Sequence, residues 1–136
     1  MKKISLIHSQ VLPAVDYAYA SHVPGGLDLY FMAGACPLDQ EGRVPEGISY
    51  EEQAKLCVEN LKAALQECGA ELTDVAYTRV LVASSDQSDL VAVWHAVREE
   101  FGSHDAPSTL SGVTILGYRG QLVEIEAVAA LPKNEK

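Results

Sequence analysis

Two carboxylates, Glu124 and Glu126, stand two residues apart in the segment Leu122–Ala130 near the end of the chain. Polar and apolar residues alternate along this segment, which is typical of a β-strand, so both carboxylates lie on one face. The opposite face is wholly apolar and consists of Val123, Ile125, Ala127 and Ala129. A positioned carboxylate can act as a general acid or base. The pattern leaves two interpretations open for each glutamate, a solvated surface charge or a site residue.

The cysteines predict neither a disulfide framework nor a zinc site. The chain has three of them, Cys36, Cys57 and Cys68, without a CxxC or Cys/His metal spacing. Cys57 and Cys68 are interpreted as small core residues of one helix. Cys36 precedes Pro37 at a predicted strand end, where its thiol is either exposed and reactive or structural. The histidines also lack the spacing of metal ligands, so no metal is expected.

Three strands are predicted ahead of the first helix. The run Lys3–His8 is a short strand, and Tyr17–Val23 and Leu27–Ala35 are two longer ones. Because Pro24-Gly25-Gly26 is a turn signal, the second and third strands are expected to form a hairpin.

Two helices flank a central strand in the middle of the chain. The first begins at Ser49, which has capping-box spacing with Glu52, and ends at Gly69. The second has Asp86 as its N-cap and ends at Gly102. The strand between them is predicted over 75–83. A loop over 104–108 and two terminal strands follow the second helix.

The resulting order, β-β-β-α-β-α-β-β, predicts one α+β domain over residues 1–136. We expect a two-layer sandwich of ferredoxin-like type, in which a mixed β-sheet carries both helices on one face. The other face keeps many apolar residues, which indicates packing against further copies of the chain. A homo-oligomer with clefts between its subunits is therefore expected.

The composition of the chain narrows the classes of molecule that it is expected to bind. The chain has 136 residues, 48% of them hydrophobic, and a formal net charge of −9. This acidic balance argues against nucleic acid and against an anionic membrane surface, since both are bound through Lys and Arg. No apolar run approaches the length of a transmembrane helix, and no signal-peptide core follows the N-terminus. The default expectation is a cytoplasmic protein.

Several short segments, taken in order, carry a resemblance that covers most of the chain. They are Tyr17–Ala20, Leu29–Gly34 with Pro37–Asp39, Tyr50–Gln53, Glu59–Leu65, Asp74-Val75, Phe101-Gly102, Gly112-Val113 and Leu122–Ala127. Together they resemble the YjgF/RidA family. The resemblance implies a homotrimer with a chorismate-mutase-like barrel of sheets and three clefts between subunits. It also implies hydrolysis of enamines or imines to ketoacids and ammonia, without a metal or a cofactor.

The family's site residues are only partly present. In the family, an Arg after a Pro-Ala pair grips the substrate carboxylate through a bidentate fork, and a Glu in the EIEA segment orients the attacking water. The resemblance places Glu124 at that catalytic carboxylate and Tyr17 at a pocket tyrosine. Ala33 stands where the family has a pocket serine. An ungapped alignment back from Glu124 places Ser108 at the Arg position, so the chain is interpreted as a divergent member that lacks the catalytic Arg.

Other side chains are expected in or beside the cleft. Leu110 and Tyr118 are candidates for lining or filling it, and Arg119 in the turn before the last strand is a candidate replacement for the missing cation. Arg79, in the middle of the central strand, is a second candidate. A solvated or ion-paired role remains open for both arginines.

Two functional interpretations follow from the sequence. One is a cofactor-free hydrolase of an enamine, imine or related reactive metabolite with altered substrate choice. The other is a non-catalytic trimer that binds a small metabolite for regulation or sequestration. A ribonuclease is disfavoured because the chain is acidic and lacks a basic aromatic patch.

Overall fold

The computed structural model describes residues 2–133 and contains the predicted order of strands and helices. Its elements are β1 (Ser5–Ile7), β2 (Ala20–His22), β3 (Leu27–Phe31), α1 (Tyr50–Glu67), a 3-10 turn (Leu72–Asp74), β4 (Val75–Ala83), α2 (Gln87–Phe101), β5 (Ser108–Val113) and β6 (Val123–Pro132). Neither helix of the described residues combines the length and the apolarity that crossing a membrane requires.

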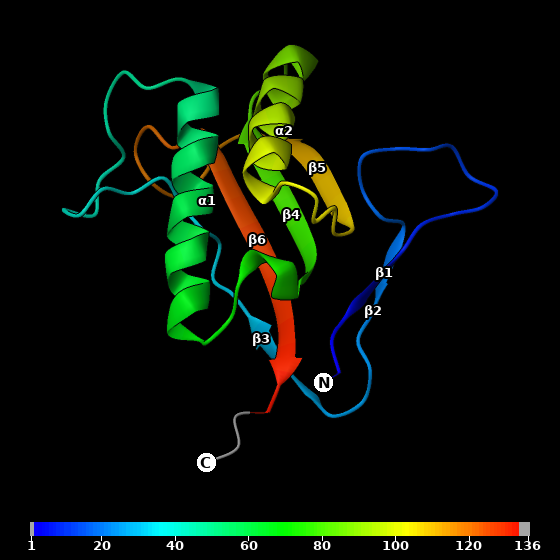
Figure 1. Ribbon diagram of the computed structural model, residues 1–136. Coiled ribbons are helices and arrows are strands. Elements are labelled where there is room, and N and C mark those ends of the chain that lie inside the picture. The colour runs from blue at the N-terminus through cyan, green and yellow to red at the C-terminus, as the bar shows by residue number, and fades with distance from the viewer. Residues whose placement is uncertain (1, 134–136) are drawn as a thin grey trace.

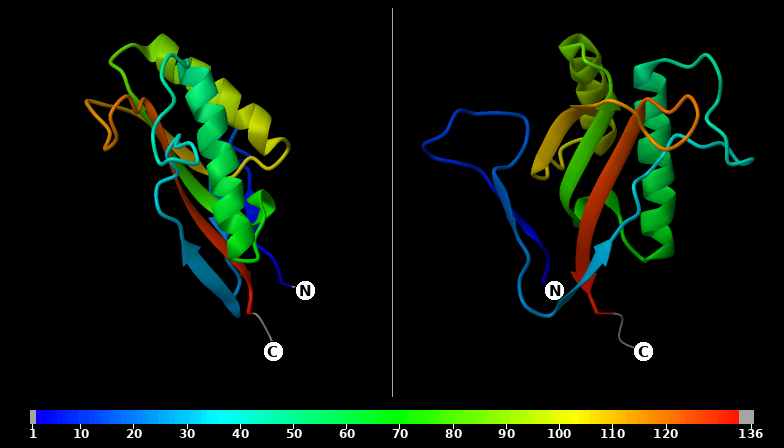
Figure 2. Two further views of the ribbon diagram at one scale, coloured as in Figure 1. Left: turned by 90° about the vertical axis from the view of Figure 1, so that its left-hand side faces the viewer. Right: turned by 180° about the vertical axis from the view of Figure 1, so that it is seen from behind.

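The main sheet has the strand order β3-β6-β4-β5, with both helices on one of its faces (Figures 1 and 2). Strands β4 and β5 are parallel and are joined through α2, whereas β6 is antiparallel to both β3 and β4. The predicted two-layer α+β arrangement with a mixed sheet is confirmed. The ferredoxin-like description is wrong, because here the helices follow the first and second strands of the sheet, not the first and third.

The predicted hairpin between the second and third strands is also wrong. Strand β2 pairs with β1 in a separate two-stranded sheet, and β3 pairs with β6. The chain between β2 and β3 crosses to the opposite edge of the main sheet (Figure 1). The long strand β6 gives β3 a partner and packs the half-buried Tyr30 against the core, and a local hairpin would offer no such surface.

Both helix starts are confirmed in atomic detail. The Ser49 hydroxyl accepts a hydrogen bond from Glu52 N at 3.1 Å, and the Glu52 carboxylate accepts one from Ser49 N at 3.0 Å. Asp86 accepts from Ser88 N at the start of α2. Gly69, just beyond α1, has φ = 80°, a conformation that favours glycine. Cys57 is buried on the inner stripe of α1 as predicted, but Cys68 is only half-buried because it caps the helix end.

The predicted alternation of the last strand is confirmed. Val123, Ile125, Ala127 and Ala129 are all buried beneath the helices. The pairing of the strands identifies the residues on the other face of the sheet, because residues directly opposite each other in paired strands point to the same face. Glu124 stands opposite Leu81 of β4, and Val128 stands opposite Phe31 of β3. We call this second side, which no helix covers, the open face.

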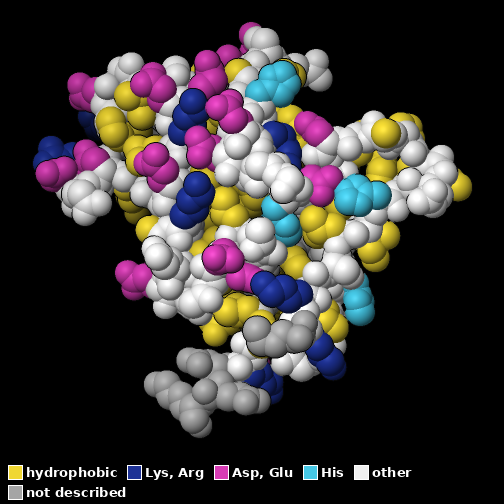
Figure 3. Space-filling view, in the orientation of Figure 1, with side chains coloured by type: hydrophobic (Ala, Val, Ile, Leu, Met, Phe, Trp, Pro, Cys, Tyr) yellow, Lys and Arg dark blue, Asp and Glu magenta, His cyan; other side chains and the backbone are white. Residues whose placement is uncertain are grey.

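The two faces differ sharply in chemistry. On the helix side, acidic side chains gather over α1 and α2 (Figure 3), among them the exposed Glu51, Glu59 and Glu99. On the open face, Phe31 is 77% exposed and Leu29 is 50% exposed. Exposed aromatic and aliphatic groups on an uncovered sheet are typical of a contact between protein chains.

Candidate functional site

Glu124 lies half-buried on the open face, and its carboxylate is held by two neighbours. The Oε1 atom accepts a hydrogen bond from Gln121 Nε2 at 3.1 Å and one from the Cys36 thiol at 3.3 Å. Among residues 2–133, no hydrogen bond to Oε2 is found, so that oxygen is available to a ligand or a water molecule. The carboxylate is thus anchored through one oxygen and open at the other.

Gln121 is the rigid part of this anchor. Only 4% of it is exposed, and its amide oxygen accepts a hydrogen bond from Tyr118 N at 3.0 Å. Its Nε2 also donates to the backbone oxygen of Val123 at 3.0 Å. A buried amide with every group bonded has little freedom to move. Gln121 therefore fixes the direction from which Glu124 is held.

Gly34 provides the space for the carboxylate. A Cβ atom at this position would overlap Glu124 Oε2 and lie 2.7 Å from its Cδ. Gly34 does not have a positive φ, so the close approach and not the backbone conformation requires glycine.

Replacing Gly34 by Ala is expected to displace the Glu124 side chain while leaving the fold intact. The clash falls on the end of a flexible side chain, so the free energy of unfolding should change by less than about 1 kcal/mol. If Glu124 is the water-orienting carboxylate that the resemblance implies, its displacement should reduce imine hydrolysis by about 100-fold. Gly117→Ala is the matched control, since a Cβ there meets nothing within 4 Å. Unchanged hydrolysis by the Gly34 variant would show that the position of Glu124 is unimportant.

The Cys36 thiol is a hydrogen-bond donor here. Burial, reinforced by the hydrogen bond and the charge of Glu124, raises the pKa of this thiol to about 11. A thiol needs a lowered pKa to be a nucleophile at neutral pH. Of the two interpretations that the sequence left open, the structure favours a structural role.

Iodoacetamide is expected to alkylate Cys36 slowly at pH 8. With a pKa of about 11, only about one thiol in a thousand is ionised at that pH, so the rate should be roughly 100-fold below that of free cysteine. The rate should rise about tenfold for each pH unit up to about pH 11, and Glu124→Gln should raise it at pH 8. Peptide mapping separates Cys36 from the half-buried Cys68. Rapid alkylation at pH 8 would contradict the Glu124 contact.

Ser108 and Leu110 lie on the helix side of the sheet, away from Glu124. Ser108 accepts a hydrogen bond from the buried Thr78 hydroxyl at 2.6 Å. Together with Tyr17 and Trp94, these two residues line a shallow pocket of about 290 Å³. Within one chain, the structure does not bring this group together with Glu124.

Thr109, not Ser108, shares the face of Glu124. Side chains alternate along β5, so a shift of one residue changes the face. Thr109 stands opposite Arg79 of β4, which in turn stands opposite Glu126 of β6. Within one chain, Thr109 therefore lies on the open face with Glu124, whereas Ser108, which the resemblance places at the Arg position, lies on the helix side.

Arg79 is the cation on the open face of the described sheet. Its guanidinium lies 3.4 Å from the Glu126 carboxylate, and about half of its side chain is exposed. Thr109 accepts or donates a hydrogen bond with the Tyr77 hydroxyl at 2.9 Å. An exposed ion pair of this kind contributes little to stability and can exchange partners.

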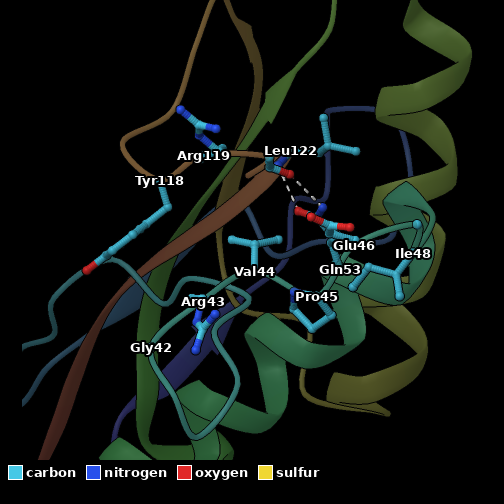
Figure 4. Close-up of a pocket in the computed structure, with 12 residues that line it drawn as sticks. Gly42, Arg43, Val44, Pro45, Glu46, Ile48, Gln53, Tyr118, Arg119 and Leu122 are labelled. Atoms are coloured by element: carbon cyan, nitrogen blue, oxygen red, sulfur yellow. Dashed lines mark hydrogen bonds between the residues drawn. The ribbon is translucent and has the colours of Figure 1, made fainter.

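Tyr118 and Arg119 line a different pocket, of about 520 Å³, next to the loop over 42–48 (Figure 4). Ala33 is exposed directly before Gly34, in the segment that follows β3. The predicted site residues thus divide among three places in a single chain: the open face, the helix-side pocket with Tyr17, and the pocket with Tyr118. Within residues 2–133, no three His, Cys, Asp or Glu side chains gather as a metal site.

Gln121, Gly34 and the role of the Cys36 thiol were missed by sequence reasoning. Cys36 and Glu124 are 88 positions apart, and no local sequence pattern predicts a contact over that separation. Gly34 alone carried a signal, because a glycine inside or just after a strand indicates close approach of another group.

Comparison with known proteins gives consistent results. The family model described as "Endoribonuclease L-PSP" matches residues 9–131. A RutC family protein of Pyrococcus abyssi is 36% identical over 125 residues, which are 91% of this chain and 94% of the relative. A protein of Escherichia coli named "Putative reactive intermediate deaminase TdcF" is 30% identical over 132 residues, 95% of this chain and 97% of the relative.

Solved structures with the same fold include two of special interest. YyfB of Yersinia pestis, described as a protein of unknown function of the Rid family, has a TM-score of 0.84 and 25% identity. The match covers 96% of this chain and all of YyfB. Escherichia coli TdcF with bound serine has a TM-score of 0.67 and 25% identity, and the match covers 96% of this chain and 99% of TdcF.

Proposed function

The chain belongs to the endoribonuclease L-PSP family, also called YjgF/RidA, and we propose that it hydrolyses a small enamine, imine or related reactive metabolite without a cofactor. The observation that carries the proposal is the Glu124 carboxylate, anchored through Oε1 and open at Oε2. A relative crystallised with bound serine supports a small molecule as the ligand class. The net charge of −9 disfavours ribonuclease activity, because RNA is bound through basic residues.

Glu124 would act as the general base. Its Oε2 accepts a proton from a water molecule while the water oxygen bonds to the imine carbon. The C=N electrons move to nitrogen, which takes this proton from the Glu124 carboxyl group to give a carbinolamine. The carbinolamine hydroxyl then gives its proton to Glu124, which passes it to the amino group, and ammonia leaves as the C–N bond breaks and the C=O bond forms. Each step needs only proton transfer at a positioned carboxylate.

A homotrimer with clefts between subunits completes the proposal. The apolar open face with Phe31 and Leu29 supports such packing, and the acidic helix side is suited to solvent. The clefts would then bring Glu124 of one subunit close to residues of another. Tyr17, Ser108 and Leu110, which lie apart from Glu124 within one chain, would meet it only across such an interface.

Altered substrate choice is expected because two pocket groups differ from the family pattern. Ala33 replaces a serine, and the Arg position is neutral whether Ser108 or Thr109 occupies it. A neutral hydroxyl cannot form the charge-assisted double hydrogen bond that holds a carboxylate. Arg79 is on the correct face to compensate.

A panel of imines tests this function. Imines with and without a carboxylate would be generated in situ from amino acids and amines and presented to the purified protein. The release of ammonia and of the carbonyl product would be followed. We expect hydrolysis above the spontaneous rate for at least one class. Lower activity of an Arg79→Gln variant on carboxylated imines alone would assign the carboxylate to Arg79.

The second candidate function is a binding protein without turnover, and the loss of both the Arg and the pocket serine favours it. In that case a metabolite would raise the melting temperature and would be recovered unchanged. Hydrolysis of no imine in the panel, combined with such a shift, would select this candidate over the hydrolase.

A further inference from the structure

Three side chains of α1 form hydrogen bonds with backbone atoms outside the helix, namely Gln53, Cys57 and Asn60. They are four and three residues apart, a spacing that places them on one side of the helix. Gln53 is 2% exposed, Cys57 is fully buried and Asn60 is half-buried, so this side of the helix faces the sheet. We call these three residues the α1 supports.

Gln53 holds the turn that leads into β6. Its Nε2 donates a hydrogen bond to Gly120 O at 2.9 Å, and its Oε1 accepts one from Leu122 N at 2.7 Å (Figure 4). Both polar ends of this amide are thus used on the residues immediately before and after Gln121, whose Nε2 donates to Glu124 Oε1. A side chain of α1 therefore fixes the place of one of the two groups that bind the carboxylate.

Asn60 holds the other group. Its Nδ2 donates to Cys36 O at 2.8 Å and to Leu38 O at 3.1 Å. These carbonyls belong to the segment from which the Cys36 thiol donates to Glu124 Oε1 at 3.3 Å. Residues 36–49 belong to no helix or strand, so side-chain hydrogen bonds such as these replace the pairing that a strand would provide.

Cys57 lies between these two residues on the helix. Its thiol donates to Val123 O at 3.4 Å, and the same carbonyl accepts a hydrogen bond from Gln121 Nε2 at 3.0 Å. Burial raises the pKa of the Cys57 thiol, so the thiol stays a neutral donor. The α1 supports thus contact, in order along the helix, the turn before β6, the first residue of β6 and the segment that contains Cys36.

We propose that Gln53 and Asn60 are positioning residues for the Glu124 carboxylate. Each acts from the helix side of the sheet through one of the two groups that bind Oε1. Rotation of the carboxylate would break both of these hydrogen bonds, so Oε2 is kept on the open side. The consequence for hydrolysis rests on the proposed function, whereas the placement of the carboxylate can be measured without a substrate.

Alkylation of Cys36 by iodoacetamide tests the role of Asn60. Asn60→Leu has a side chain of similar size but donates no hydrogen bond, so the thiol should leave its contact with Glu124. The rate at pH 8 should rise at least fivefold, and the pH at which the rate levels off should fall below the wild-type value of about 11. Val58→Ala is the control for lost stability, because Val58 is a fully buried core residue of α1.

This control should lower the melting temperature and leave the alkylation rate within about twofold of the wild type. An unchanged rate in Asn60→Leu, or the same increase in Val58→Ala, would overturn the role of Asn60.

Exchange of one backbone amide hydrogen tests the role of Gln53. Tyr118 N donates to Gln121 Oε1, so the protection of this amide reports whether Gln121 stays in place. Gln53→Met keeps the length of the side chain without its hydrogen bonds and should speed exchange at Tyr118 at least tenfold in NMR spectra. The amide of Ala35, which donates to Ile125 O at 2.7 Å, should change by less than twofold. Equal acceleration at both amides, or none at Tyr118, would overturn the role of Gln53.

Steady-state kinetics connects both residues to the proposed reaction. In each variant, kcat for imine hydrolysis should fall at least tenfold while KM stays within about threefold, because the carboxylate moves and the substrate contacts remain. Asn60→Ala and Gln53→Ala repeat the measurements if a larger variant does not fold. A wild-type protein that hydrolyses no imine would refute the proposed function, and alkylation and exchange would still decide how Glu124 is held. Faster alkylation and exchange with unchanged kcat would overturn the positioning role and leave the hydrolase intact.

Discussion

Replacing Glu124 by Gln is expected to lower kcat/KM for imine hydrolysis by about 10²- to 10⁴-fold, the range that a positioned general base contributes. The amide has the size and shape of the carboxylate but cannot accept a proton from water. Its oxygen can still accept the hydrogen bonds from Gln121 and Cys36 that hold Glu124 Oε1. The fold should therefore be retained, with little change in melting temperature. Initial rates of ammonia release at saturating and limiting imine, compared with the wild type, measure the effect.

Glu126→Gln is the matched control for this prediction. Glu126 lies on the same face of β6, two residues further on, and is paired with Arg79 instead of with Cys36 and Gln121. Its loss should change kcat/KM by no more than a few-fold, because an exposed ion pair contributes little. If the two variants lose activity equally, the general-base role cannot be assigned to Glu124. If the Glu124 variant keeps full activity, the proposed mechanism is wrong.

The parts of this fold that are local in sequence were predictable. The capping box of Ser49 and Glu52, the N-cap at Asp86 and the alternation of β6 all appear in the structure where the sequence placed them. Each helix cap depends on residues within one or two turns of each other, and the alternation of β6 depends on a strand whose inner face is wholly apolar. Interactions between residues close in sequence determine these features, so tertiary contacts did not override them.

The parts that depend on distant partners were not predictable. The turn at Pro24-Gly25-Gly26 indicated a hairpin, but β3 pairs with β6, about a hundred residues later in the chain. Likewise, the contact of Cys36 with Glu124 joins two segments that only the completed sheet brings together. Ser108 shows a third limit: the alignment did not say which face of the sheet a side chain takes, and the pairing of β5 with β4 places Ser108 on the helix side and its neighbour Thr109 on the open face.

Replacing Phe31 by Asp is expected to dissociate the proposed trimer. Phe31 is 77% exposed on the open face, and burying such a ring in an interface stabilises it by about 1.5–3 kcal/mol. An aspartate at the same place loses this gain and adds the cost of burying a charge without a partner. Because the substitution occurs once in every subunit, the effect accumulates over the assembly. Sedimentation should then report one 14.6 kDa chain where the wild type shows three.

Val91→Asp is the control for this substitution. Val91 is 48% exposed on α2, on the acidic helix side, so an added aspartate there should leave the assembly intact. If the site is shared between subunits, hydrolysis should fall together with the trimer in the Phe31 variant and persist in the Val91 variant. A wild-type protein that sediments as a monomer would refute the shared cleft outright. A dissociated Phe31 variant with full activity would instead place the whole reaction on one chain. Glu124 and its neighbours on the open face would then carry out hydrolysis without residues of another subunit.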